Sequence, residues 1–334
     1  MAKEYKSLTP EQVEFFLENG YVVIKQAFTK EQAAERTKDV WTRLGRDPSD
    51  KATWDQERIH MPVHQRERVA DFAPKAWEAM KDLLGGEERI DPASATWGDS
   101  FIVNFGTPEL EKEGSDIAPP DLTNWHVDGD FFIHFLDSPE QALLVIPLYS
   151  EIKPRGGATY ISPDGIDLVA NYLAEHPEGV RPINLTFIPT THTDENEYPD
   201  NFYHLREIKR CKRFVEMTGE IGDVVLMHPL MMHSASKNHL RIPRIITNPP
   251  VALREPFNFN RENPDEFSLV ELKTLKALGV DRLDFRPTTE RRRVVPLREI
   301  LQKKMLEDEK RRLEELTRKA EGLSLSGAQA IAVA

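Results

Sequence analysis

The sequence has only one cysteine, Cys211, in 334 residues. One cysteine cannot form an internal disulfide, so the small disulfide-stapled folds of secreted proteins are excluded and a reducing compartment is indicated. The sequence also lacks an excess of basic residues, because its formal net charge is −12. General nucleic-acid binding needs a basic face, so we expect no nucleic-acid partner.

Long apolar runs are absent as well. No stretch reaches the roughly 20 apolar residues that a bilayer-spanning helix needs, so we expect no membrane partner. The opening MAKEYKSLTPEQ has no apolar signal-peptide region, and the closing AIAVA matches no carboxy-terminal address signal. These features predict a cytoplasmic protein.

Glycine-rich phosphate loops and internal repeats are also missing, which argues against P-loop, Rossmann and solenoid folds. What is present is a globular composition, with 39% hydrophobic and 8% aromatic residues. A chain of this length can bury a sizeable core. We expect a single domain over residues 1–322 and a disordered tail at 323–334.

Helix signals lie towards both ends of the chain. Thr9-Pro10-Glu11-Gln12 combines an N-cap, a first-turn proline and a capping-box glutamine, and it predicts a helix before the strand YVVIKQAF. Thr29 with Gln32 predicts a second helix towards Leu44. Apolar periodicity predicts further helices in AWEAMKDLL, SLVELKTLKALG and LREILQKKMLEDEKRRLEELTRKAE. The last has no continuous heptad seam, so we expect a monomer or a weak homodimer.

The middle of the chain has a different pattern. Short apolar runs alternate with Gly, Pro and Asp, among them SFIVNFG, NWHVDGDFFIHF, ALLVIPLYS, GATYISP and RIITNPPVAL. Many short strands separated by turn signals are typical of a sandwich or a barrel. The predicted fold class is mainly β with flanking helices: a helical N-terminal part at about 1–94, a β core at about 95–255 and C-terminal helices at about 256–321.

The segment NWHVDGDFFIHF, residues 124–135, places polar groups in an apolar strand. Residues two apart on a strand project to the same face, so His126 and Asp128 can point at one metal ion. This is the spacing of the first two ligands of a 2-His-1-carboxylate triad, which leaves open positions on Fe(II). A His-x-Asp pair alone is a short motif that chance often produces.

A partner for this motif follows in GEIGDVVLMHPLMMHSASKNHLRIPR. His233, arriving from a distant strand, can complete the triad, and His228 would replace it if the strand register differed. Arg244 opens the next strand, and its guanidinium fork suits bidentate binding of a carboxylate.

Together these segments resemble the phytanoyl-CoA dioxygenase family of Fe(II)/2-oxoglutarate-dependent oxygenases. LTPEQVEFFLENGYVVIKQAF resembles the family's opening, WHVDGD its His-x-Asp strand, KPRGGATYISP its Gly-Gly segment and HSASKNHLRIPR its distal histidine segment. The similarity covers most of the chain. It implies a double-stranded β-helix (jelly-roll, cupin-like) core within a single oxygenase domain.

The resemblance implies that His126, Asp128 and His233 bind Fe(II), and that Arg244 binds the distal carboxylate of 2-oxoglutarate. O₂ would be the other co-substrate, and no catalytic residue beyond the metal ligands is implied. Halogenating relatives carry a small residue in place of the Asp128 carboxylate. Hydroxylation of a C–H bond is therefore expected here, with 2-oxoglutarate converted to succinate and CO₂, and desaturation, ring closure or endoperoxide formation stay open.

Three further residues are predicted around the site. Asn124, on the strand face of the triad, and Thr159, just past the Gly-Gly pair, would neighbour 2-oxoglutarate. His134 would be a substrate contact, unless the turn at Gly129 rotates it away and leaves it with a structural or surface role.

A long polar loop at 189–207 carries three aromatic residues, Tyr198, Phe202 and Tyr203, which are candidate substrate contacts. Long loops in compact domains are often lids or binding loops, although a plain surface excursion fits equally well. No basic cradle for the phosphates of coenzyme A is evident. A small-molecule substrate of secondary metabolism is therefore preferred to an acyl-CoA.

Two functions other than the oxygenase fit parts of the sequence. The Asp128-Gly129-Asp130 sequence could be the aspartate pair of a metal-dependent glycosyltransferase, but that fold needs alternating strands and helices. A catalytically inactive jelly-roll protein that binds a small molecule is the second alternative, because fold does not guarantee activity.

Overall fold

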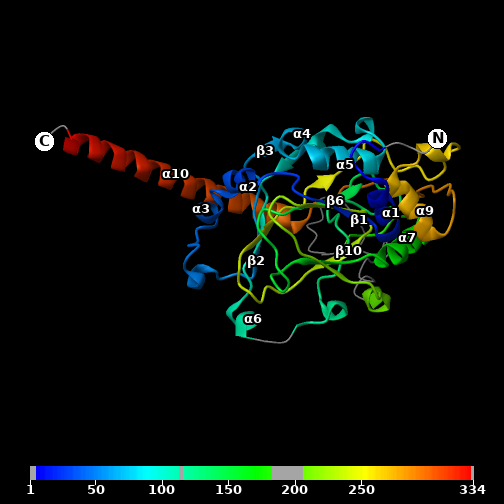
Figure 1. Ribbon diagram of the computed structural model, residues 1–334, viewed down its shortest axis with the longest axis horizontal. Helices are drawn as coiled ribbons and strands as arrows, with labels where there is room; N and C mark the ends of the chain where they lie inside the picture. The colour runs from blue at the N-terminus through cyan, green and yellow to red at the C-terminus, as the bar shows by residue number, and fades with distance from the viewer. Residues whose placement is uncertain (1–4, 113–115, 183–205, 332–334) are drawn as a thin grey trace.

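The computed structural model describes residues 5–112, 116–182 and 206–331 of the chain. Sheets occupy the middle of these residues and helices lie at both ends (Figure 1). The α-helices are α1 (Pro10–Asn19), α2 (Lys30–Thr37), α3 (Val40–Leu44), α4 (Val69–Phe72), α5 (Pro74–Leu84), α6 (Pro108–Lys112), α7 (Gly165–Glu175), α9 (Leu269–Leu278) and α10 (Leu297–Ile331). The strands are β1 (Tyr21–Ile24), β2 (Arg58–His60), β3 (Arg66–Arg68), β4 (Thr96–Gly98), β5 (Ile102–Asn104), β6 (Leu143–Pro147), β7 (Thr159–Ser162), β8 (Val215–Met217), β9 (Val224–Met227), β10 (Met232–Ala235), β11 (Arg244–Ile246) and β12 (Pro250–Val251).

The sheets confirm that the middle of the chain is built of short strands with flanking helices. One sheet has the order β1-β9-β6-β12, a second β10-β7-β8, a third β11-β5-β2 and a fourth β3-β4. Isolated bridges extend this pairing: Leu148 to Ile246 joins the β6 side to the β11 side, and His126 to His233 adds residue 126 to the β10 edge. Strands β1 and β2 come from the part predicted as helical, and they pair with β9 and β5.

The helix ends follow the predicted local chemistry. In α1, the Thr9 hydroxyl accepts a hydrogen bond from Gln12 N, and the Gln12 side chain accepts from Thr9 N, so the capping box is complete. Gly20 ends the helix at φ 71°, a left-handed conformation that glycine adopts without steric cost. Helix α9 packs against α1, α5 and α7, which brings both ends of the chain onto one apolar core.

Two predictions about elements need correction. The helix predicted from residue 30 towards Leu44 is two helices, α2 and α3, and the first ends at Thr37, whose hydroxyl donates to Ala33 O (2.8 Å). The charged helix predicted to end at Glu321 is α10, which runs to Ile331 and so enters the segment predicted as a disordered tail.

The segment 124–135 is not a regular strand. Gly129 has φ 119°, and a side chain there would collide with the rings of Phe132 and His134, so only glycine can make this turn. Beyond the turn, the backbone pairs with the segment before α10 through Ile133 N to Arg292 O (3.0 Å) and Val294 N to Phe131 O (2.7 Å). The turn separates the metal-ligand pair from the residues that follow it.

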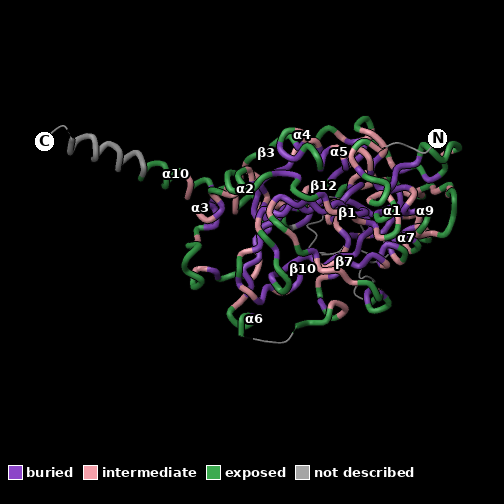
Figure 2. Tube along the Cα trace, in the orientation of Figure 1, coloured by how far each residue is buried: buried purple, intermediate pink, exposed green. Residues whose placement is uncertain are grey.

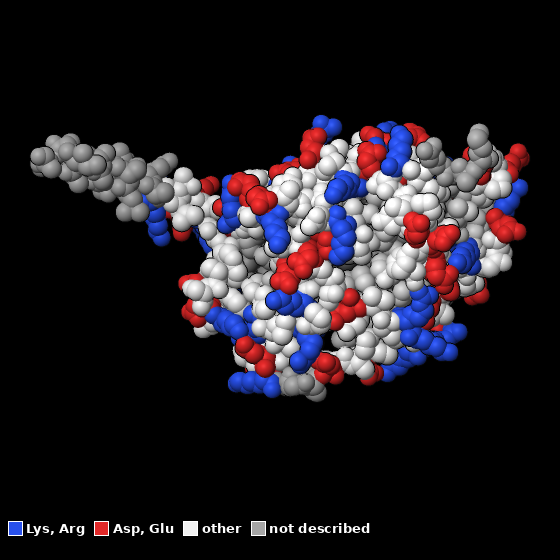
Figure 3. All heavy atoms as spheres, viewed as in Figure 1, with Lys and Arg blue, Asp and Glu red and all other residues white. Residues whose placement is uncertain are grey.

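Helix α10 starts against α3 and extends away from the other elements (Figure 1). Buried residues concentrate in the sheets and in the helices around α9 (Figure 2). Acidic and basic side chains are interspersed on the face seen in Figure 3. Within the described ranges, no helix combines the length and the apolar character needed to cross a bilayer.

Candidate metal centre

Three predicted ligands come together in the structure. One ligand atom each from His126, Asp128 and His233 lies within 4.8 Å of the other two. The Asp128 Oδ1 atom is 3.5 Å from His126 Nε2 and 3.6 Å from His233 Nε2. Two imidazoles and one carboxylate at this spacing fit a facial Fe(II) site with open positions.

Backbone pairing sets the two histidines side by side. His126 N donates to His233 O (3.0 Å), and His233 N donates to His126 O (2.9 Å). Each imidazole then uses its Nδ1 on a nearby carbonyl, His126 on Asn124 O (2.7 Å) and His233 on Met231 O (3.0 Å). Donation from Nδ1 leaves the lone pair on Nε2, which is the atom that faces Asp128, so both rings are oriented as metal ligands.

Charge interactions within the triad shift the pKa values of Asp128 and His233. Burial opposes ionisation of Asp128, but the His233 and His126 rings outweigh it and hold the pKa of Asp128 well below its usual range. Burial likewise disfavours the charged form of His233, yet Asp128 raises the pKa of His233. A divalent cation held by the three side chains would likewise stabilise the Asp128 carboxylate.

Asn248 is a site residue that the sequence patterns did not single out. Its Nδ2 donates to Asp128 Oδ2 at 3.3 Å, so it contacts the carboxylate oxygen that does not face the histidines. The signal was present in RIITNPPV: Asn248 lies four residues after Arg244, and even spacing on an extended strand keeps both side chains on one face.

Arg244 is buried, with 2% of its surface exposed, at the start of β11. Its Nε donates to Gly157 O (2.9 Å) and its Nη1 lies near Ile102 O (3.4 Å). Burial, with a contribution from Arg58, lowers the pKa of Arg244 to about 9, so it stays charged at neutral pH. No carboxylate pairs with this guanidinium anywhere in the described part of the chain, which leaves it available to an anionic ligand.

The two predicted neighbours of the co-substrate lie close to the triad along the chain or across a sheet. Thr159 is buried on β7 opposite Ala235, and because His233 and Ala235 are two apart on β10, Thr159 faces the same side as His233. Asn124 contributes its carbonyl to the His126 ring, and no hydrogen bond of its side chain is among those of the described residues.

His228, the alternative ligand, is engaged elsewhere. Its Nε2 is 2.9 Å from the Thr274 hydroxyl on α9, and its Nδ1 accepts from Leu230 N (3.2 Å). Burial lowers the pKa of His228 to about 3, which keeps the ring neutral. His228 therefore joins helix α9 to the sheet.

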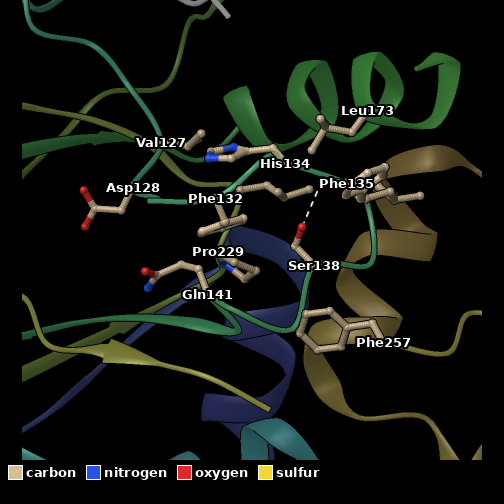
Figure 4. Close-up of a pocket in the computed structure, with 12 residues that line it drawn as sticks. Val127, Asp128, Phe132, His134, Phe135, Ser138, Gln141, Leu173, Pro229 and Phe257 are labelled. Carbon is tan, nitrogen blue, oxygen red and sulfur yellow. Dashed lines mark hydrogen bonds between the residues drawn. The ribbon is translucent and has the colours of Figure 1, made fainter. Parts of the chain in front are cut away.

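His134 is buried and contacts the turn at Gly129. Its Nε2 contacts Gly129 O (2.7 Å), and its ring stacks on Phe132. Figure 4 shows His134 and Phe132 in an apolar pocket, with the Asp128 carboxylate at the edge and pointing away from the apolar side chains. His134 thus braces the turn that positions Asp128, and its contact with a substrate stays a prediction.

Asp130 forms an ion pair with Arg298 on α10. Both of its oxygens bind Arg298, at 2.5 Å to Nε and 2.6 Å to Nη2. The first turn of α10 is thereby fixed two residues from the ligand Asp128. The predicted substrate contacts Tyr198, Phe202 and Tyr203 lie outside the described residues.

Comparisons with known proteins add one family and several distant structures. Residues 184–246 match the family model of phytanoyl-CoA dioxygenase (PhyH). No curated protein matches the sequence.

Three solved structures illustrate the structural likeness. Hypothetical protein JW0805 from Escherichia coli is 14% identical, with 82% of each chain covered and a TM-score of 0.45. HygX from Streptomyces hygroscopicus, with nickel, 2-oxoglutarate and hygromycin B bound, is 12% identical, with 76% of this chain and 90% of that chain covered and a TM-score of 0.40. SnoK, a non-heme α-ketoglutarate-dependent carbocyclase from nogalamycin biosynthesis, is 14% identical, with 75% and 87% covered and a TM-score of 0.39.

TM-scores of this size do not establish a common fold, so the assignment rests on the residues of this chain and on the family-model match. That match includes His233 and Arg244, the third ligand and the unpaired arginine of the centre described above. The resemblance to the phytanoyl-CoA dioxygenase family is therefore confirmed over residues 184–246.

Proposed function

We propose that this protein is an Fe(II)/2-oxoglutarate-dependent dioxygenase that hydroxylates a C–H bond of a small molecule and converts 2-oxoglutarate to succinate and CO₂. One observation carries the proposal: two Nε2 atoms and one carboxylate converge next to a strand that presents a buried, unpaired arginine. A metal ion alone would need only the two histidines and the carboxylate. A metal ion with a carboxylate co-substrate also needs the arginine.

The chain's residues would divide the work as follows. His126, Asp128 and His233 would hold Fe(II), which supplies the oxidising chemistry when bound together with 2-oxoglutarate and O₂. Asn248 keeps one Asp128 oxygen engaged, so the other is directed at the metal. Arg244 would bind the distal carboxylate of 2-oxoglutarate through its free N–H groups, with Thr159 and Asn124 beside the co-substrate.

The strand pairing supports the finer proposal of a double-stranded β-helix core in a single domain over residues 1–322. With the isolated bridges included, β1, β9, β6, β11, β5 and β2 follow one another in one row, and residue 126, β10, β7 and β8 in another. Two facing rows of this kind are what a jelly roll requires. The triad and Arg244 would then come from opposite rows and meet between them.

Substrate identity stays at the level of a small molecule of secondary metabolism, with Tyr198, Phe202, Tyr203 and His134 proposed as contacts. The alternative is a catalytically inactive protein that binds a small molecule in the same fold. Unpaired Arg244 and the orientation of both histidine rings favour the oxygenase, since burying a cation without a ligand costs stability and a scaffold gains nothing from it.

The deciding experiment adds Fe(II) and 2-oxoglutarate anaerobically to metal-free protein and records the visible charge-transfer absorption of the chelate. We expect a band in the wild type, none in His233→Ala and a band that needs much higher 2-oxoglutarate concentrations in Arg244→Ala. His176→Ala and Arg286→Ala are matched controls, because these side chains interact with Glu178 and Asp284 at the surface. A folded wild-type protein without the band would refute the oxygenase and favour the binding protein.

A further inference from the structure

A second arginine lies near Arg244 on the same sheet. In the order β11-β5-β2, Arg244 pairs with Asn104, and Asn104 pairs with Arg58. Residues directly opposite one another on neighbouring antiparallel strands project to the same face. The two arginines are therefore separated by one strand, about 10 Å across the sheet, with an uncharged asparagine between them.

This shared face is the one that looks at the metal centre. Asn248, four residues beyond Arg244, reaches Asp128 at 3.3 Å, and Ile246 lies between them on the same side. Ile246 pairs with Ile102, which pairs with His60. Strand β2 (Figure 1) thus adds two side chains, Arg58 and His60, to the face that carries Arg244 and Asn248.

Arg58 has no partner in the described part of the chain, neither an ion pair nor a hydrogen bond of its guanidinium. The nearby carboxylates are occupied by other cations. Glu57 is bound by Lys237 at 3.0 and 3.1 Å, and Asp130 by Arg298. Arg58 is only partly exposed, and partial burial lowers its pKa. Partial burial weakens the hydration of the guanidinium, which favours its use in binding an anion.

His60 gives this corner a neutral polar group. It is reached by solvent but closely surrounded, and this partial burial, with the charges of Arg58 and Arg244, lowers the pKa of His60 to about 4. At neutral pH the uncharged ring can donate or accept one hydrogen bond next to the arginine.

The proposed co-substrate does not account for Arg58. The two positive charges of Fe(II) and the one of Arg244 balance the charge of Asp128 and the two carboxylates of 2-oxoglutarate. Once these are in place, Arg58 is the cation on this face that still lacks a counter-charge among the described residues. Among the described residues and the proposed co-substrate, no anion remains for Arg58, which favours an anion that enters with the substrate.

We propose that the primary substrate carries an oxyanion, a carboxylate or a phosphate, that Arg58 binds with His60 beside it. The inference rests on the proposed function and refines its substrate class. A planar guanidinium fork recognises both oxyanions by paired N–H bonds. The substrate would then be held by its charged end at β2, with the carbon to be oxidised turned towards the triad.

The test measures binding directly and uses three small probes of matching shape. Protein saturated with Fe(II) and 2-oxoglutarate under anaerobic conditions is titrated calorimetrically with benzoate, phenyl phosphate and the neutral benzamide. We expect one of the anions to bind the wild type at least about tenfold more tightly than benzamide, as charge-assisted hydrogen bonds imply. Arg58→Gln should abolish that preference, and Arg58→Lys should retain part of it.

The matched control is Arg68→Gln, which removes an exposed arginine from strand β3 of a separate sheet and should leave the anion preference unchanged. A second readout is the thermal midpoint of the ligand-free protein. Removal of an unpaired charge should leave it equal or higher in Arg58→Gln, whereas loss of a structural arginine would lower it. If the thermal midpoint of Arg58→Gln falls, the test instead compares the anion preference of Arg58→Lys, which should be partly retained, with that of the wild type.

The results distinguish binding of a substrate anion from binding of the co-substrate. If the wild type does not prefer either anion to benzamide, the inference is wrong. If Arg58→Gln instead weakens 2-oxoglutarate binding and leaves the preference intact, Arg58 belongs to the co-substrate and the inference is wrong. Failure of the oxygenase proposal would look different, because the charge-transfer band would be missing from the wild type while Arg58-dependent anion binding could persist.

Discussion

Two groups of buried charge in this protein are built in opposite ways. The first is a helix-anchoring cluster of Arg43, His64, Asp99 and Glu309, which joins α3 to α10. Every nitrogen of the Arg43 guanidinium is used: Nε on Glu309 (2.8 Å), Nη1 on Asp99 (3.0 Å) and Nη2 on Pro62 O (2.7 Å). The second group, Arg58 and Arg244, has no carboxylate partner in the described part of the chain.

Whether a cation has a carboxylate partner in the folded chain separates charges that serve folding from charges proposed to serve a ligand. In the helix-anchoring cluster, the Arg43 cation meets two carboxylates in the folded chain itself, so its charge is compensated without a ligand. On the face of β11 and β2, positive charge is left uncompensated by the residues that the structure describes, and among these residues Asp128 interacts with Asn248 and two histidines. Uncompensated charge of this kind lowers stability unless a ligand is bound, which supports the proposed binding roles of Arg244 and Arg58.

The largest effect on stability is expected at Glu309. This residue is fully buried, and its Oε2 also lies 2.8 Å from His64 Nε2. Glu309→Gln removes one partner of a buried ion pair, and we expect the free energy of unfolding to fall by about 3 kcal/mol. Urea denaturation at neutral pH measures this change.

The matched control for Glu309 lies on the same helix. Glu314 pairs with Arg318 at the surface (3.5 Å), so Glu314→Gln should change the unfolding free energy by less than about 0.5 kcal/mol. Equal effects of the two substitutions would mean that the buried cluster does not anchor α10. The charges of this cluster could then not be contrasted, as charges that serve folding, with Arg58 and Arg244.

A smaller effect is expected at Asn248. Asn248→Ala removes the hydrogen bond to Asp128 Oδ2 without touching a metal ligand. Groups that orient ligands typically contribute about 10- to 100-fold to metal affinity, so we expect Fe(II) or Mn(II) to bind more weakly by that factor. Metal titration of the purified variant measures it, and Asn171→Ala, at an exposed asparagine of α7, serves as the control. Unchanged metal affinity would show that Asp128 is positioned by its turn alone.

Much of this site could be predicted from local sequence patterns. The spacing of His126 and Asp128, and the position of His233 behind them, identified the three groups that the structure brings together, and the order of the segments marked Arg244 as the arginine that opens β11. Capping boxes at Thr9 and Thr29 likewise marked true helix starts. These signals are local, since each depends on a few neighbouring residues.

The remainder depends on which strands pair. Arg58 looked like any surface arginine in the sequence, because only the pairing of β2 with β5 places it on the face of Arg244. The strand predicted for residues 124–135 failed for a related reason: the turn at Gly129 is stabilised by Phe132, His134 and a segment more than a hundred residues away. Such long-range contacts leave no periodic trace in the sequence.

The smallest predicted effect concerns His228, a buried histidine that is neutral and fully hydrogen-bonded, unlike the charged groups of either cluster. Because burial depresses its pKa to about 3 in the folded state, the unfolded chain takes up the proton first as the pH falls below about 6.5. The contribution of His228 to stability is therefore complete above that pH and is lost as the pH falls towards 3, by up to about 1.4 kcal/mol per unit.

Between pH 7 and pH 5.5 the loss from this one group should be about 1 kcal/mol. Urea unfolding at both pH values, compared between wild type and His228→Gln, isolates it from other titrating groups, because the variant should lose less stability on acidification by that amount. His176→Gln is the surface control and should follow the wild type. A variant as acid-sensitive as the wild type would mean that His228 can be protonated in place. In that case the hydrogen bonds with Leu230 and Thr274 do not hold the ring neutral. They would then also not explain why His228 stays away from the metal centre.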